Sequence, residues 1–247
     1  MIIIRILLVG FLFSWFGLIC LVGNLLFLPL IALRLNKFKF FENIARDLVY
    51  LAWKFFIFCT KILGYLDYEF KDSNRLGKPS QIVIANHPSL LDVVFVLSKV
   101  RRINCVVKSD LAKNIFLSPA IKASNYIVNS EDEELLNKSL NVLKSGDSLL
   151  IFPEGTRTKD SINFHKAPFY MAIHGAKILT PIFIDMNPRS LQKGVKWYNT
   201  PKTKIKYKIK ISDDLTLKSF LSDKPNTIRV KTLHKQMNEI YQKEIKC

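Results

Sequence analysis

The stretch Ile82–Asp92, IVIANHPSLLD, carries the strongest fold signal in the chain, because an apolar β-branched run passes directly into polar residues. The run predicts a buried strand. Pro88 is favoured at the first position of a helix, since its missing N–H has no partner there. We therefore expect His87 at the carboxyl end of a strand and Asp92 about one and a half turns into a helix. Ligands of open α/β sheets gather at such strand ends.

The same alternation continues on the carboxyl side of this stretch. Further strands are expected at residues 103–107, 126–128, 149–152, 178–184 and 204–211, the last with the period of two of a half-exposed strand. Helices are expected from an N-cap at Ser130 to Lys144, at 167–175, and around 233–241. This order predicts an α/β domain with a mixed, largely parallel sheet flanked by helices.

The amino-terminal region is apolar enough to enter a membrane. Ile6–Leu33 is 28 residues long and contains no charged residue, whereas about 20 apolar residues suffice to cross a bilayer. A signal peptide would have an apolar core of roughly 7–15 residues followed by small residues, so we expect the segment to be retained. Its glycines and Pro29 leave open whether it spans the bilayer or re-enters it. Basic residues follow the run, which predicts a cytoplasmic location for the rest of the chain.

Residues 38–66 have the pattern of a second, amphipathic helix. Bulky aromatic residues beside Lys54 and Lys61 suit a helix at the membrane interface, and a core helix of the main domain is the alternative. We therefore expect two regions, membrane-anchoring helices over 1–66 and an α/β domain with a basic carboxyl-terminal part over 67–247.

The charge of the chain is strongly positive and unevenly distributed. The formal net charge is +17, and residues 186–247 contribute 15 basic against 5 acidic residues, a net +10. Beside an apolar anchor, this excess favours an anionic membrane surface over solvent alone. No nucleic-acid-binding signature accompanies it, so we expect no nucleic-acid partner. The four cysteines form no CxxC pair and lie at no ligand spacing from a histidine, so we expect no metal site.

Two polar clusters follow predicted strands. In the first, Asp92 can accept a hydrogen bond from one imidazole nitrogen of His87 and leave the other nitrogen free as a base. An H-x4-D pair alone arises by chance in about one chain in five, and an ordinary polar junction is the alternative. The second cluster, Phe152–Thr158 (FPEGTRT), offers a flexible Gly155, the Thr156 hydroxyl and the phosphate-binding fork of Arg157. Together the clusters predict one site at the edge of the sheet.

The motif pair NHPSLLD and FPEGTRT resembles the glycerolipid acyltransferase family, whose best-known members are 1-acylglycerol-3-phosphate O-acyltransferases. The lysine-containing segment Val106–Leu111 and the later blocks Phe164–Ala167 and Leu179–Ile182 resemble the family too. The resemblance runs from about residue 80 to 185. It also implies a membrane-seated amino terminus of two helices.

What the resemblance implies is direct acyl transfer without a cofactor. His87 would remove a proton from a lysophospholipid hydroxyl, Asp92 would orient it, and the alkoxide would attack an acyl thioester of acyl-carrier protein or coenzyme A. Substrate-binding roles fall to six residues: Glu154, Gly155 and Thr156 in the acceptor site, Arg157 on the acceptor's phosphate, and Lys108 and Lys166 as further phosphate contacts. The expected location is the cytoplasmic face of the inner membrane, in phospholipid biosynthesis.

One block departs from the family pattern. The family commonly has a Phe-Ile-x-Arg segment whose arginine helps to bind the acceptor's phosphate, whereas the corresponding segment here is Tyr126–Asn129, YIVN. Asn129 can donate hydrogen bonds but brings no charge. The acceptor therefore stays open between 1-acylglycerol-3-phosphate and another lipid.

Two other functions compete with acyl transfer. Gly146–Leu149, GDSL, matches the signature of a class of serine esterases, but none of His165, His174 and His234 has the aspartate at −3 that this class requires. We interpret His174 and His234 as structural and give His165 a weaker claim to the site. The second rival is a membrane-anchored basic protein that binds lipid without catalysis; such a protein would not need His87.

Overall fold

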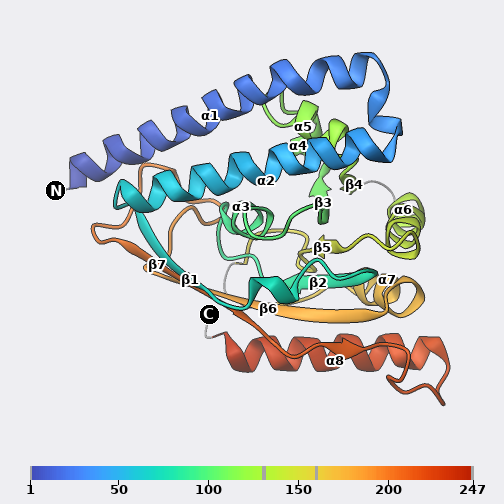
Figure 1. Cartoon of the computed structure of the whole chain (residues 1–247). Helices are drawn as coiled ribbons and strands as arrows, with labels where there is room; N and C mark the ends of the chain where they lie inside the picture. Colours follow the sequence, from blue (N-terminus) through green and yellow to red (C-terminus); the bar gives the residue numbers. More distant parts are fainter. Residues whose placement is uncertain (1, 130–131, 159–160, 246–247) are drawn as a thin grey trace.

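A mixed eight-stranded sheet forms the centre of the computed structural model, which describes residues 2–129, 132–158 and 161–245 (Figure 1). The strand order is β1-β7-β6-β2-β5-β3-β4, with β8 paired to β6. The strands are β1 (Leu66–Phe70), β2 (Gln81–Ala85), β3 (Asn104–Lys108), β4 (Ile127–Asn129), β5 (Leu149–Ile151), β6 (Ile178–Asn187), β7 (Ile205–Ile211) and β8 (Leu215–Thr216). The five strands from β4 to β6 are parallel, and β7 and β8 run antiparallel to β6. The predicted sheet class is confirmed.

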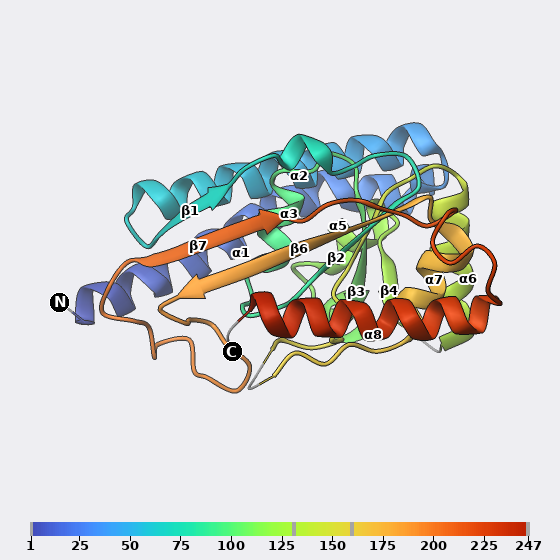
Figure 2. The same ribbon diagram turned by 90° about the horizontal axis from the view of Figure 1, so that it is seen from below.

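Helices cover both faces of this sheet (Figures 1 and 2). On one face lie α1 (Ile2–Ala32), α2 (Lys39–Ile62), α3 (Asp92–Leu97), α4 (Ser109–Lys113) and α5 (Ser118–Ala123); on the other lie α6 (Asp132–Lys144), α7 (Ala167–Gly175) and α8 (Asn226–Glu244). Short 3-10 turns follow α1 and β1, at Leu35–Lys37 and Ser73–Arg75. Each face has its own apolar core, so each sheet face is buried as an α/β architecture requires. The predicted N-cap of α6, Ser130, lies outside the described residues.

The predicted amino-terminal pair of helices is present as a hairpin. α1 is a single helix, long and apolar enough to cross a membrane by length and composition, and it lies beside α2, where Phe16 stacks on Trp53 with ring centroids 4.8 Å apart. Only one side of α1 packs on the domain. The opposite side exposes residues such as Leu7 and Leu25, which leave a broad apolar surface uncovered.

Two predicted helix boundaries were wrong, and hydrogen bonds explain both. α3 begins at Asp92 and not at Pro88, because the Asn86 side chain exchanges two 2.8 Å hydrogen bonds with the backbone of Ile184 and holds the preceding loop against β6. α2 was expected to reach Leu66 but ends at Ile62, because Gly64 adopts a φ of +74°, which favours glycine. Leu66 instead opens β1, a strand that the sequence did not predict.

Candidate active site

The first polar cluster forms a hydrogen-bonded pair at the carboxyl end of β2. His87 Nδ1 lies 2.8 Å from Asp92 Oδ2, and the same oxygen accepts a 2.7 Å hydrogen bond from the Ser89 N–H. Asp92 is fully buried, whereas His87 is 16% exposed. Burial raises the pKa of the Asp92 carboxyl, and the hydrogen bonds from His87 and Ser89 act in the opposite direction. With Nδ1–H donated to Asp92, the lone pair of the neutral imidazole is on Nε2, where it can act as a base.

The second polar cluster holds the backbone of His87 in place. The parallel pairing of β2 with β5 brings the two motifs together at one edge of the sheet. Glu154 Oε1 accepts hydrogen bonds from the His87 N–H at 2.9 Å and from the Thr158 hydroxyl at 2.7 Å. The Thr158 N–H donates to the His87 carbonyl at 2.8 Å. These bonds fix the histidine's backbone on both sides, so its ring can turn only about its own side-chain bonds.

The structure places the Glu154 carboxylate against the backbone of His87, whereas the resemblance implied a place in the acceptor site. Its side chain is buried, and burial raises the pKa of its carboxyl, while the bonds from Thr158 and the His87 amide favour the charged form. Glu154 is absent from the residues that line the cavity described below. Its observed contacts are those of a residue that positions His87.

This placement predicts how Glu154 variants behave. Glu154→Gln keeps an acceptor oxygen for the His87 amide and should keep kcat within about tenfold, whereas Glu154→Ala removes that acceptor and should lower kcat by about 10²-fold. The KM for the acceptor should change little in both variants, because the side chain does not reach the cavity. Steady-state kinetics with a varied acceptor concentration measures kcat and KM for both variants. A rise in KM at constant kcat would instead indicate that Glu154 contacts the acceptor.

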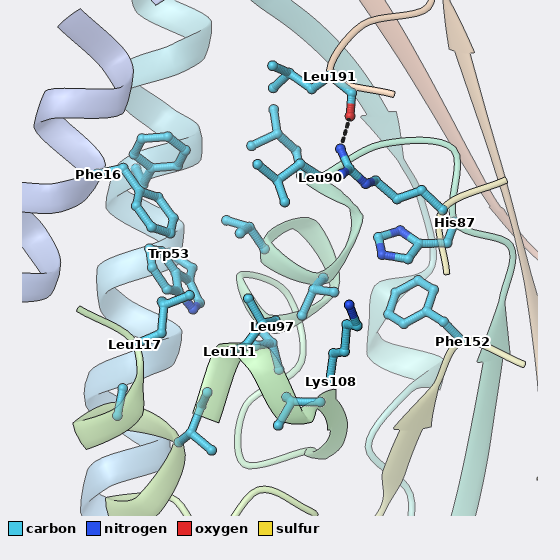
Figure 3. Close-up of a pocket in the computed structure, with 18 of the residues that line it drawn as sticks. Phe16, Trp53, His87, Leu90, Leu97, Lys108, Leu111, Leu117, Phe152 and Leu191 are labelled. Atoms are coloured by element: carbon cyan, nitrogen blue, oxygen red, sulfur yellow. Dashed lines mark hydrogen bonds between the residues drawn. The ribbon is translucent and has the colours of Figure 1, made fainter. Parts of the chain in front are cut away.

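An apolar cavity of about 750 Å³ opens beside His87. Figure 3 shows His87 and Phe152 on one side of it and Phe16 and Trp53, from the helical hairpin, on the other. Phe152 packs against the imidazole with ring centroids 4.5 Å apart. The wall between the two sides is apolar and comes from α3, α4 and α5, with contributions from Val94, Leu97, Leu111, Leu117 and Ile121. The cavity has the size of a small-molecule site and is lined mainly by apolar side chains.

Polar residues line the same cavity near the histidine. Thr156 and Arg157 contribute side chains to its lining, and Gly155 between them and the strand adopts a φ of +64°, a conformation that glycine permits without strain. The Arg157 guanidinium donates a 2.6 Å hydrogen bond to the Leu191 carbonyl (Figure 3). Lys108 lines the cavity too and is paired with Asp110. Arg157 and Lys108 thus bring basic groups near His87 that suit an anionic ligand, and Asp110, the partner of Lys108, lines the cavity as well.

Other predicted residues lie elsewhere. Lys166 precedes α7 and does not line the cavity. Gly146–Leu149 lies at the opposite end of β5 from Phe152, where Asp147 pairs with Lys39 and the buried Arg46, so this segment is the predicted turn between helix and strand. His174 bonds to the Tyr170 carbonyl and His234 to the Phe164 carbonyl, which agrees with structural roles. The ring of His165 lies 3.5 Å from where a Cβ on Gly155 would be.

Several supporting residues were not predicted. Thr158 and Leu191 hold His87 and Arg157, and the buried Tyr207 packs against Phe95 of α3 with ring centroids 4.6 Å apart. Lys193 lines the cavity from the loop that carries Leu191. Only Tyr207 had a sequence signal, as an inward-facing position in the alternating strand β7.

Comparison with known proteins finds similarity to acyltransferases over the part of the chain that carries the site. Residues 67–185 match the family model described as Acyltransferase. The 1-acyl-sn-glycerol-3-phosphate acyltransferase of Saccharomyces cerevisiae is 33% identical over 136 residues, which are 50% of this chain and 45% of the relative. The protein of the same name from Helicobacter pylori is 30% identical over 128 residues, 49% of this chain and 52% of the relative. The chain thus spans about half the length of the curated relatives it matches.

A solved structure has the same fold over nearly the whole chain. The crystal structure of the 1-acyl-sn-glycerophosphate (LPA) acyltransferase PlsC from Thermotoga maritima superposes with a TM-score of 0.67 at 23% identity, covering 97% of this chain and 98% of that chain. The mixed sheet with its helical hairpin is thus the fold of that solved structure. Both motifs lie inside residues 67–185, the part of the chain that resembles the Acyltransferase family. Large apolar side chains are exposed on both α1 and α2, and α1 is long and apolar enough to cross a membrane by length and composition.

Proposed function

We propose that this protein transfers a fatty acyl group from an acyl thioester to the free hydroxyl of a lysophospholipid, with 1-acylglycerol-3-phosphate as the preferred acceptor. The observation that carries the proposal is that one cavity is lined by the His87 imidazole, by the cations Arg157 and Lys108, and by a long apolar wall. A lysophosphatidic acid has the complementary parts, namely a hydroxyl, a phosphate and a fatty chain. The names of the two relatives support this acceptor.

In the proposed reaction, His87 Nε2 takes the proton from the acceptor hydroxyl while Asp92 holds the other ring nitrogen. The acceptor oxygen forms a bond to the thioester carbonyl carbon, the carbon–sulfur bond breaks, and the proton passes from His87 to the leaving thiolate. Positioned general-base catalysis of this kind typically contributes about 10²–10⁴-fold. Arg157 would hold the phosphate with its planar fork, and Lys108 would add a second positive charge.

The fatty chains have a place in the apolar part of the cavity. Its walls, from Phe16 and Trp53 to Leu97 and Leu117, offer no charged partner (Figure 3). Because the helical hairpin supplies part of this wall, a chain could enter from the lipid side without crossing water. We further propose that the donor is acyl-carrier protein or coenzyme A, that no cofactor takes part, and that the enzyme works on the cytoplasmic face of the inner membrane.

A second acceptor is favoured by one observation. Asn129 lines the cavity directly beside Lys108, its partner in the β3–β4 pairing, and contributes no charge there. A lysolipid whose phosphate already carries a head group has less negative charge to neutralise. Such a lipid would need fewer cations than 1-acylglycerol-3-phosphate.

An acceptor panel separates the two candidates. Detergent-purified protein is given palmitoyl thioesters of acyl-carrier protein or coenzyme A with lysophosphatidic acid, lysophosphatidylglycerol, lysophosphatidylethanolamine or lysophosphatidylcholine, and products are identified by mass spectrometry. We expect kcat/KM to be highest for lysophosphatidic acid. In Arg157→Ala this preference should fall by about tenfold or more, as expected for a lost charge-assisted contact. A higher kcat/KM for an acceptor with a head group would support the second candidate instead.

A further inference from the structure

The loop between β6 and β7, residues 188–204, is fastened at both ends. Near its start, the Ser190 hydroxyl lies 3.1 Å from the Tyr65 hydroxyl, and the next carbonyl, that of Leu191, accepts the bond from Arg157. Near its end, the Pro201 carbonyl accepts a 2.6 Å hydrogen bond from Arg5 of α1. The middle of the loop is therefore held at a fixed place beside the amino-terminal half of α1 (Figure 1).

The middle of the loop presents large apolar side chains to solvent at this place. Trp197 packs on α1, 3.6 Å from where a Cβ on Gly10 would be and with its ring centroid 6.1 Å from that of Phe13. It is nevertheless 46% exposed, and the neighbouring Val195 and Tyr198 are 43% and 40% exposed. These side chains thus extend the exposed apolar surface of α1 beyond the helical hairpin.

Basic residues accompany these aromatic side chains. The loop contains five basic residues and no acidic residue: Arg189, Lys193, Lys196, Lys202 and Lys204. The Lys196 ammonium lies over the Tyr198 ring, 5.5 Å from its centroid. Tryptophan and tyrosine are enriched at membrane–water interfaces, where their rings sit at the level of the head groups. Lysines beside them are attracted to anionic lipids.

We propose that Lys193–Tyr198, the interfacial loop, is a second membrane contact in which Trp197 and Tyr198 lie among the head groups of an anionic phospholipid bilayer. Because Leu191 and Lys193 line the cavity, this contact brings the cavity's rim to the bilayer surface next to Arg157. An amphiphilic acceptor could then reach His87 without leaving the membrane. The contact does not depend on which lysolipid is the acceptor.

Fluorescence of Trp197 tests the contact directly. The chain has three tryptophans, so the full-length variant Trp15→Phe/Trp53→Phe keeps Trp197 alone. It is added to vesicles of phosphatidylglycerol and phosphatidylcholine whose acyl chains carry bromine near the head group or near the chain end. We expect a blue shift of the emission and stronger quenching by the shallow bromines. The matched control adds Trp197→Phe and Tyr170→Trp, which moves the tryptophan to an exposed position on α7, on the other face of the sheet, and should remain unquenched.

The substitutions Trp15→Phe and Trp53→Phe lie in the helical hairpin and could disturb it. A second experiment therefore keeps all native tryptophans and compares two lysine variants. Lys196→Gln should lower partition into the anionic vesicles by roughly fivefold. Lys206→Gln should leave partition unchanged, because the neighbours Ile205 and Tyr207 face the core under α2 and Lys206 points to the other side of the sheet. Unquenched Trp197 in protein that sediments with the vesicles would overturn the proposal. Equal losses in the two lysine variants, or no sedimentation at all, would also overturn it.

Discussion

Replacing His87 with alanine is expected to lower kcat for acyl transfer by roughly 10²–10⁴-fold while the protein stays folded. Among the described residues that line the cavity, His87 is the only histidine. The bonds to Glu154 and Thr158 are made by the histidine's backbone and survive the substitution. Thiol release measured with a chromogenic reagent gives the rate, and circular dichroism on heating gives the fold.

His174→Ala is the matched control for this experiment. Its ring stacks on Tyr170 and lies outside the cavity, so transfer should continue at close to the normal rate. If His87→Ala retained near-normal turnover, His87 would not be the base, and lipid binding without catalysis would become the better account of the chain.

Replacing Asp92 with asparagine is expected to lower kcat by about 10²-fold, with little change in the KM for donor or acceptor. The amide cannot stabilise the imidazolium that forms when His87 takes the proton. If the amide turns its nitrogen toward His87, the ring is held in the wrong tautomer. If its oxygen stays there, the nitrogen occupies the place of Oδ1, which has no hydrogen-bond partner among the described residues.

Stability measurements distinguish this effect from a folding defect. Removing a fully buried carboxylate also removes its desolvation cost, so the unfolding temperature of Asp92→Asn should not fall by as much as a lost core residue would cause. A large drop in unfolding temperature together with a raised KM would mean that Asp92 serves mainly to hold the loop 86–91, and the catalytic role assigned to it would be wrong.

The sequence predicted those parts of the site that depend on local order along the chain. His87 and Asp92 are five residues apart, and both motifs directly follow strands, so the parallel pairing of β2 with β5 was sufficient to bring them together. The strand β7 and the long apolar helix α1 were predicted too, because periodicity and hydropathy are local properties of the sequence. The sheet class followed from the alternation of these elements.

What the sequence did not predict depends on contacts between distant segments. The pairing of Asn86 with Ile184 decides that Pro88 lies in a loop, and the bond from the His87 amide holds the Glu154 carboxylate on the backbone of His87. Leu191 reaches Arg157 from a loop without regular structure, for which no periodic signal exists. β1 was missed although its residues, LDYEF, alternate between apolar and polar, because the predicted helix was extended to Leu66, where this strand begins.

The most direct test of the account is the stoichiometry of the reaction with and without an acceptor hydroxyl. Purified protein is incubated with a palmitoyl thioester and either lysophosphatidic acid or its analogue that lacks the free hydroxyl, and released thiol and esterified lipid are both quantified. We expect one phosphatidic acid for each thiol released with lysophosphatidic acid, and almost no thiol with the analogue. Equal thiol release from both mixtures, without phosphatidic acid, would show hydrolysis in place of transfer and would contradict the account.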